Sequence, residues 1–139
     1  RWINIIGSIN GVIVALAYAG IGFAPYDLGP VYLTVHVDFV YISFTGTLLT
    51  LMLYTIAIFL NKKVSNFYAW VLIVCSVISI GYLVLLFGGS AIPALSGWVV
   101  QAVGQKIIVY TEIITFSILA IGMQRTNKRE YLAAEAVAS

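Results

Sequence analysis

Residues 31–60 read VYLTVHVDFVYISFTGTLLTLMLYTIAIFL, an apolar run in which Asp38 is the only acidic residue and no lysine or arginine occurs. A helix needs about 20 mainly apolar residues to cross the hydrocarbon core of a bilayer. The run therefore predicts a membrane-spanning helix. Because it exceeds the length that one crossing requires, we expect this helix to tilt or to protrude from the bilayer.

Three further apolar runs accompany it, at about residues 2–24, 67–87 and 98–123. Hydrophobic residues make up 62% of the whole chain and charged residues 9%, whereas a soluble domain carries about 25% charged residues. The composition and the lengths of the runs predict an all-α polytopic membrane protein with four spans.

Short connections join the four runs: a proline-flanked turn at 25–30, a polar hairpin at 61–66 and a glycine-rich segment that begins at Gly88. Because short connections make successive spans antiparallel, we predict a four-helix antiparallel transmembrane bundle over residues 1–123. A polar cytoplasmic tail is expected at 124–139. A chain of 139 residues has no room for a separate soluble catalytic domain beside four spans.

The basic residues near the span ends all fall on one side of this bundle. They are Arg1, Lys62, Lys63, Arg125, Lys128 and Arg129. Lysine and arginine next to spans are retained on the cytoplasmic side. We therefore expect a multi-pass protein of the cytoplasmic (plasma) membrane with both termini in the cytoplasm. Since this anchoring explains the net charge of +2, the lipid bilayer is an expected partner and nucleic acid is not.

Polar and small residues line one face of each predicted span. At about 100° per residue, the second span carries a stripe within about 40° of one line. The stripes are His36, Ser43, Thr47, Thr50 and Tyr54 on the second span; Asn4, Ser8, Gly11, Ala15, Tyr18 and Gly22 on the first; Tyr68, Cys75, Ser79 and Tyr82 on the third; and Gln101, Gln105 and Glu112 on the fourth. These faces are predicted to contact protein and not lipid, with Gly7, Gly11, Ser43, Thr47 and Ser79 as helix-packing residues.

Three charged residues inside the spans are harder to explain by packing. Counted from the outer ends, Asp38 lies about 10 Å deep and Lys106 about 12 Å deep, so the two side chains are candidates for an ion pair. Glu112 lies about 20 Å deep, where we expect it to be protonated or hydrogen-bonded to Gln105 or to a hydroxyl of the second span.

Two interpretations of these residues remain open. They form an interhelical clamp or a contact with a partner subunit, or else they form an ion or proton path in which His36, Asp38 and Glu112 are stations.

The sequence gives no support for a cofactor or a metal. Zinc needs three or four ligands, and His36 with Asp38 offers at most two, on nearly opposite helix faces. A bis-histidine haem needs two imidazoles, and the chain has one histidine. Cys75 is the only cysteine, which excludes an internal disulfide. Since no phosphate-binding loop or nucleophile elbow is present either, no enzyme activity is expected.

Several short motifs resemble those of a known family. They are Phe23-Ala24-Pro25-Tyr26-Asp27, then His36 at the head of a long span, the basic pair Lys62-Lys63, and Gly104-Gln105-Lys106 followed by Tyr110. Together, over residues 20–123, they resemble the last four helices of an uncharacterised family of prokaryotic six-span membrane proteins that is distantly similar to the DRAM-type proteins of eukaryotes.

The resemblance implies a membrane bundle in which Asp27, His36, Gln105 and Lys106 share a site on the outer side. It implies no reaction. This chain differs from the family in having no counterpart of the first two helices, and Lys106 stands where the family more often has arginine.

Three classes of function follow from these observations. The prediction is a non-catalytic accessory or structural subunit of a larger membrane protein complex, associated with other membrane subunits or forming a homo-oligomer. The alternative is a small transporter or ion or proton channel that uses Asp38, Lys106 and Glu112. A weaker alternative is a lipid-acting membrane enzyme that uses His36 and Asp38. Stripes that converge on a cavity reaching Glu112 would favour transport, and stripes that face away from the bundle would favour a partner.

Overall fold

The computed structural model describes residues 2–88 and 97–138, so most of the predicted outer loop between the third and fourth runs lies outside the described residues. Within the described part, the helices are α1 (Trp2–Phe23), α2 (Pro30–Leu60), α3 (Asn66–Gly88) and α4 (Trp98–Ala138), with a short 3-10 helix, η1 (Tyr26–Leu28), between α1 and α2. The described part is all α-helical apart from η1 and the turns, which confirms the predicted all-α class, and all four α-helices are long and apolar enough to cross a membrane.

Local sequence explains where the helices begin and end. Gly29 has a φ of 121°, a left-handed conformation that glycine adopts without strain, and Pro30 follows it at the first position of α2. The backbone N–H of Phe67 donates a hydrogen bond to the Ser65 hydroxyl at 3.3 Å, so Ser65 caps α3. In the 61–66 hairpin, the Asn61 side chain accepts a hydrogen bond from the backbone N–H of Lys63 at 3.1 Å.

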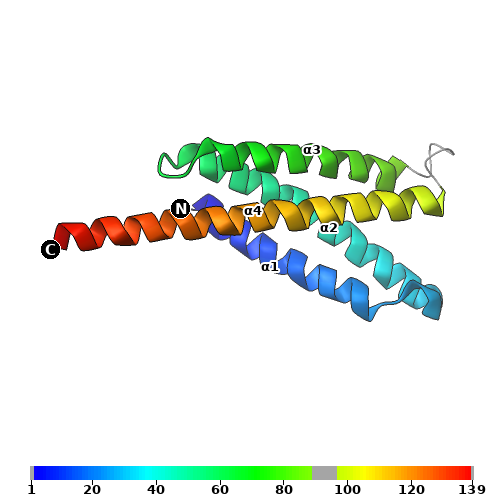
Figure 1. Ribbon diagram of the computed structural model, residues 1–139. Coiled ribbons are helices and arrows are strands. Elements are labelled where there is room, and N and C mark those ends of the chain that lie inside the picture. Colours follow the sequence, from blue (N-terminus) through cyan, green and yellow to red (C-terminus); the bar gives the residue numbers. More distant parts are fainter. Residues whose placement is uncertain (1, 89–96, 139) are drawn as a thin grey trace.

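The end of α4 differs from the prediction. We predicted that the span ends near 123 and that a polar tail follows, with its alanine-rich end as a frayed helix. The helix α4 continues without interruption to Ala138 and projects beyond the other helices (Figure 1). No glycine or proline occurs after Gly122, and the last residues are rich in alanine, the strongest helix former. The polar residues that follow the apolar part of α4 favour helix, so they continue the helix beyond that part.

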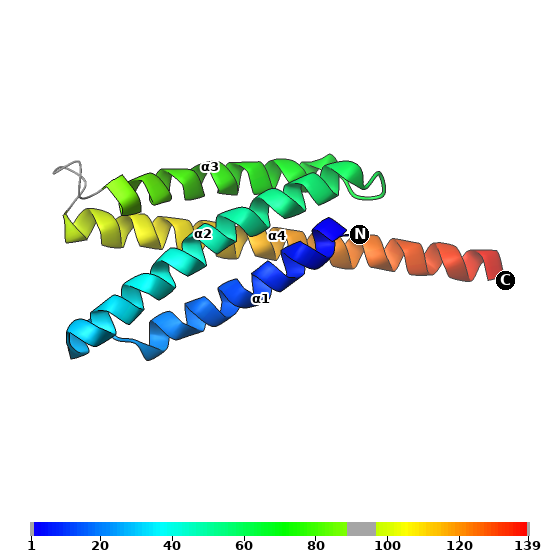
Figure 2. The same cartoon turned by 180° about the vertical axis from the view of Figure 1, so that it is seen from behind.

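Each helix packs along its neighbour in the chain, α1 on α2, α2 on α3 and α3 on α4. The four helices do not stay together over their whole length. Both views show that the α1–α2 hairpin diverges from the α3–α4 pair toward η1 and approaches it at the opposite end (Figures 1 and 2). The architecture is thus two antiparallel helix pairs that are joined at one end and open at the other.

The interior combines two apolar clusters with buried hydroxyl groups. Val40, Phe44, Tyr82 and Ile108 form one cluster, and Leu51, Leu72 and Cys75 form the other. Ser43, Thr47, Thr50, Ser79 and Thr115 are also buried. Large apolar side chains such as Trp70 and Ile114, each 60% exposed, cover the outer faces. The prediction that the polar stripe of the second span faces protein is confirmed for its buried members.

Two glycines outside the predicted set, Gly46 and Gly20, make close helix contacts. A methyl group at Gly46 would lie 2.5 Å from Cγ2 of Val14, and one at Gly20 would lie 2.6 Å from the Phe39 ring. Gly7 is buried, and a methyl group added there would lie 3.7 Å from Leu53 and from Tyr54, so Gly7 packs as predicted. Gly11 does not: a methyl group there would meet nothing within 4 Å, because this turn of α1 faces a cavity.

Replacing Gly46 by Ala should destabilise the α1–α2 hairpin by about 1–3 kcal/mol, because the new methyl group overlaps Val14 in a packed contact. Gly11→Ala is the matched control and should leave stability unchanged or slightly raised, since alanine favours helix and has open space there. Unfolding of both variants by sodium dodecyl sulfate, followed by circular dichroism, measures the difference. Equal losses of stability would contradict the assigned contact.

Candidate functional site

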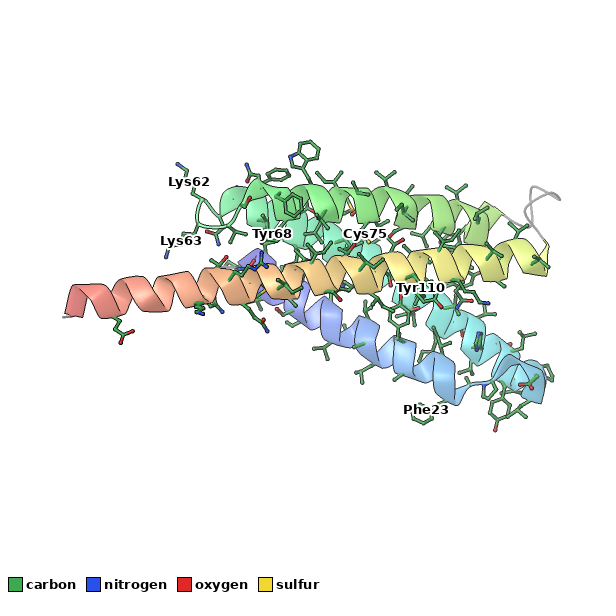
Figure 3. The ribbon with its side chains drawn as sticks, viewed as in Figure 1. Phe23, Lys62, Lys63, Tyr68, Cys75 and Tyr110 are labelled. Atoms are coloured by element: carbon green, nitrogen blue, oxygen red, sulfur yellow. The ribbon has the colours of Figure 1, made fainter. Side chains whose placement is uncertain are left out.

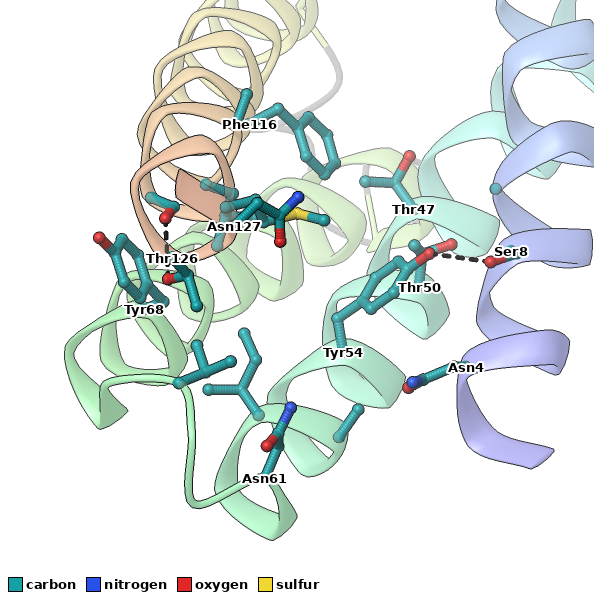
Figure 4. A pocket seen from close by; sticks show the side chains of 18 of the residues that line it. Asn4, Ser8, Thr47, Thr50, Tyr54, Asn61, Tyr68, Phe116, Thr126 and Asn127 are labelled. Carbon is teal, nitrogen blue, oxygen red and sulfur yellow. Dashed lines mark hydrogen bonds between the residues drawn. The ribbon is translucent and has the colours of Figure 1, made fainter. Parts of the chain in front are cut away.

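A cavity of about 880 Å³ lies between α1, α2 and α4 and is closed at its side by the 61–66 hairpin and the start of α3 (Figure 4). Its position follows from the antiparallel order of the helices. Asn4, Asn61, Lys63 and Asn127 line the end where the basic residues gather, and Tyr18, Thr47 and Phe116 line the deepest part. The cavity therefore runs from the basic end of the molecule to about the middle of the spans.

One wall of the cavity is polar and comes from α1 and α2. It consists of Asn4, Ser8, Tyr18, Thr47, Thr50 and Tyr54. These are members of the polar stripes that periodicity predicted for the first and second spans, so the two stripes converge on one space. The hydroxyls of Ser8 and Tyr54 share a hydrogen bond of 3.3 Å across it (Figure 4).

The opposite wall is apolar and comes mainly from α4. Phe116, Leu119, Ala120 and Met123 line it, and Ala57 and Ile58 of α2 extend it toward the mouth. A cavity with one hydrogen-bonding wall and one apolar wall suits an amphipathic occupant better than a fully hydrated ion.

Asn10 holds the polar wall together. Its side-chain amide donates hydrogen bonds to the carbonyl oxygen of Gly46 and to Oγ1 of Thr50, both at 2.7 Å. Asn10 is not a member of the polar stripe predicted for the first span. The residue lies beside the stripe, toward α2, and an asparagine within an apolar span was the only signal that could have identified it.

Glu112 lies beyond the deepest part of the cavity and is 6% exposed. The Tyr18 hydroxyl, which belongs to a cavity-lining residue, donates a hydrogen bond of 2.7 Å to Oε2 of Glu112. Oε1 is buried and has no hydrogen-bond partner among the described residues. Glu112 is thus hydrogen-bonded, as one of the two expected outcomes, but not to Gln105 or a hydroxyl of the second span: the partner comes from α1, which reaches α4 at this level.

The hydroxyl groups around this level are already used as donors. Ser43, Thr47 and Ser79 donate to the backbone carbonyls of Val40, Ser43 and Cys75, at 3.0, 2.8 and 2.9 Å. No ion pair involves Glu112 within the described ranges. A buried carboxylate without a cationic partner is costly in a low-dielectric interior. The arrangement can therefore hold a proton or a small cation at Glu112.

Aromatic rings close the cavity beyond Glu112. Tyr18 contacts Phe44 edge to face at 5.6 Å between ring centroids, and Phe44 contacts Tyr82 at 4.6 Å. Phe44 and Tyr82 belong to the cluster that includes Val40 and Ile108, and Tyr18 packs against this cluster. The cluster lies on the η1 side of the cavity. A packed apolar layer thus separates this end of the cavity from the opposite side of the spans.

The other predicted site residues do not come together. Asp38 and Lys106 are both exposed, and no ion pair joins them in the described part of the chain, because α2 and α4 diverge on this side (Figure 1). Equal depth alone did not bring them into contact. The predicted ion pair is wrong.

The outer-side site that the family resemblance implied is divided between the two helix pairs. Nδ1 of His36 donates a hydrogen bond to the carbonyl oxygen of Ala24 at 2.7 Å and so ties α2 to the end of α1, next to the exposed Asp27 of η1. Gln105 and Lys106 lie on α4, across the opening. In residues 2–88 and 97–138, no three His, Cys, Asp or Glu side chains are close enough to hold a metal ion.

Comparison of the chain with models of protein families, with curated proteins and with solved structures gives no significant match. The family resemblance therefore stays a prediction.

The cavity should be accessible to water from the basic end only. In a Cys75→Ala background, Ala15→Cys should react with a membrane-impermeant thiol reagent added on that side, because Ala15 lines the cavity and thiolates form in water. Leu16→Cys is the control at the same depth: Leu16 is 67% exposed but does not line the cavity. Mass spectrometry of reconstituted vesicles measures labelling. Equal reaction of the two cysteines, or reaction from the other side, would contradict the assigned mouth.

Proposed function

We propose that this chain is a small membrane transport protein in which Glu112 carries a proton while a solute occupies the cavity. The observation that carries the proposal is the hydrogen bond from Tyr18 to Glu112, because it connects a buried carboxyl group to a residue that lines the cavity. An ionisable residue inside a membrane protein most often marks a substrate, ion or proton path.

The helix arrangement supports a transport cycle. A cavity that extends from one end of the spans to about their middle, with packed rings beyond it, fits the geometry expected of one state in alternating access. The α1–α2 and α3–α4 pairs are joined at one end and separate at the other (Figure 2). Rocking of one pair against the other would open the layer around Phe44 and close the mouth at Lys63.

The proposed orientation follows from charge. The mouth of the cavity lies at the end that carries Lys62, Lys63, Arg125 and Lys128. Basic residues beside spans are retained in the cytoplasm. We therefore place the mouth and both termini on the cytoplasmic side of the plasma membrane.

A second candidate, the accessory subunit, is favoured by a different observation. Asp38 and Lys106 are exposed within the apolar length of α2 and α4. Charged side chains that face acyl chains are costly, and neighbouring protein of opposite charge would compensate them. Such a neighbour is another membrane subunit or a second copy of this chain. The lipid-acting enzyme has the least support, since His36 is engaged with Ala24 and Asp38 faces outward.

Replacing Glu112 by Gln should lower proton flux about tenfold or more in vesicles loaded with a pH-sensitive dye and driven by a potassium diffusion potential, because an amide keeps the size of the side chain but cannot carry the proton. Glu135→Gln is the matched control. Glu135 is exposed on the part of α4 beyond the apolar span, and its replacement should leave the flux unchanged. Identical flux through the original chain and Glu112→Gln would remove the case for transport.

The accessory-subunit candidate predicts that the chain co-purifies with a membrane protein in mild detergent. Asp38→Asn combined with Lys106→Gln should weaken that association, because it removes the two exposed charges. Native mass spectrometry measures the mass of the purified species. A monomer without bound protein, before and after the two substitutions, would contradict this candidate and leave transport as the proposal.

A further inference from the structure

Two opposite charges lie on the outer surface of the spans. Asp38 of α2 and Lys106 of α4 are both exposed within the apolar lengths of their helices. Neither makes a hydrogen bond or an ion pair with the side chains described in residues 2–88 and 97–138. The side chain of aspartate is too short to reach the aqueous surface from inside a span, so this charge in particular favours neighbouring protein.

The remaining charged residues of the same copy do not supply the partner. Residues 89–96 contain no charged residue. Along the helix axis, α4 reaches Arg129 and Glu130 only about 35 Å after Lys106. Arg1 precedes Trp2, at the end of α1 remote from η1. A protein partner for either charge therefore has to come from outside this copy.

The two charges lie at the same depth. Asp38 and Lys106 each stand eight residues after the first residue of their helix, which is about 12 Å along it. Both helices start on the η1 side and run in the same direction through the molecule (Figure 1). A rotation of one copy about the membrane normal preserves depth, so it brings Asp38 of one copy level with Lys106 of another.

The two charges point to different outer faces. Asp38 precedes Val40 by two positions, and Lys106 precedes Ile108 by two positions; Val40 and Ile108 belong to the same buried cluster. Two positions correspond to about 200° around a helix, so each charged side chain points away from that cluster. The helix α4 is in front in Figure 1 and α2 is in front in Figure 2, which views the opposite side. One copy thus offers its two charges to two different neighbours, which is a head-to-tail arrangement.

The surface next to each charge is apolar. Ile42 follows Asp38 by one helical turn and is 47% exposed. Tyr110 follows Lys106 by one turn and is 64% exposed, and Figure 3 shows it beside α4. Because the two helices run in the same direction, an ion pair between Asp38 and Lys106 places Ile42 level with Tyr110. The apolar contact and the ion pair therefore require the same register.

We propose that the outer face of α2 around Asp38 binds the outer face of α4 around Lys106 in a second copy of this chain, so that the copies associate head to tail in the membrane. The Lys106 ammonium group of one copy donates hydrogen bonds to the Asp38 carboxylate of the next. The alternative for each group is an unpaired charge beside acyl chains, which is the more costly state. The assembly goes beyond the proposed transport function and does not depend on it, since the cavity and Glu112 lie on the inner sides of the helices.

Energy transfer between donor- and acceptor-labelled copies of the full chain in phosphatidylcholine vesicles measures the association. Asp38→Lys and Lys106→Asp should each raise the dissociation constant at least about tenfold, because like charges then face one another. An equimolar mixture of the two variants should recover the energy transfer, since each supplies the charge that the other lacks. Asp27→Lys, an equal reversal at an exposed residue of η1, is the matched control and should have no effect.

Disulfide cross-linking tests the register and the head-to-tail order. In a Cys75→Ala background, Ile42→Cys combined with Tyr110→Cys should join copies when copper phenanthroline is added as the oxidant, and denaturing gels should show a ladder that extends beyond two chains. Ile42→Cys combined with Val77→Cys is the control, because Val77 is 63% exposed but lies on α3, outside the proposed interface.

Three results would overturn the proposal: an original chain that stays monomeric in the vesicles, charge reversals at Asp38 and Lys106 that act no differently from Asp27→Lys, or a mixture of the two reversed variants that stays dissociated. A ladder that stops at two chains would exclude the head-to-tail order. All of these results concern assembly alone, and the proton flux of Glu112→Gln is measured separately, so failure of the interface and failure of transport are distinguishable.

Discussion

A hydrocarbon solvent offers no hydrogen bonds, so each polar side chain within these spans needs a partner in the protein. It also removes most of the apolar driving force between helices, because acyl chains are as apolar as the side chains that they contact. Polar contacts then decide how the helices associate. The amide of Asn10 joins α1 to α2, and the hydroxyl of Tyr18 joins α1 to Glu112 of α4. Both contacts position α1, most of whose large apolar side chains face outward.

The same constraint shapes the cavity. Since the polar faces of α1 and α2 turn inward together, they form a hydrogen-bonding wall, while α4 contributes an apolar one. The packed rings around Phe44 then separate the cavity from the open side of the molecule. A buried carboxyl group at this boundary and basic residues at the other end of the cavity are two features that the proposed transport site would combine. Helix packing alone does not require these features to occur around the same cavity.

Much of the fold was predictable because span length and helical periodicity are local properties of the sequence. The four spans came from the lengths of the apolar runs, and the convergence of Ser8, Thr47 and Thr50 on one space follows from stripes that repeat with the helix. The errors have a common cause. The predicted Asp38–Lys106 pair assumed that equal depth brings two helices together, and the role assigned to Gly11 assumed that each small residue marks a contact.

The sequence by itself determined which segments are helices and which face of each helix avoids lipid, since both depend on neighbouring residues and on the solvent. Only the tertiary structure decided which faces meet. It separated the helix pairs at the η1 end, paired Glu112 with Tyr18 and not with Gln105, and left a space beside Gly11. These outcomes depend on the relative rotation and tilt of whole helices, which small differences in packing between distant segments determine and which no local pattern records.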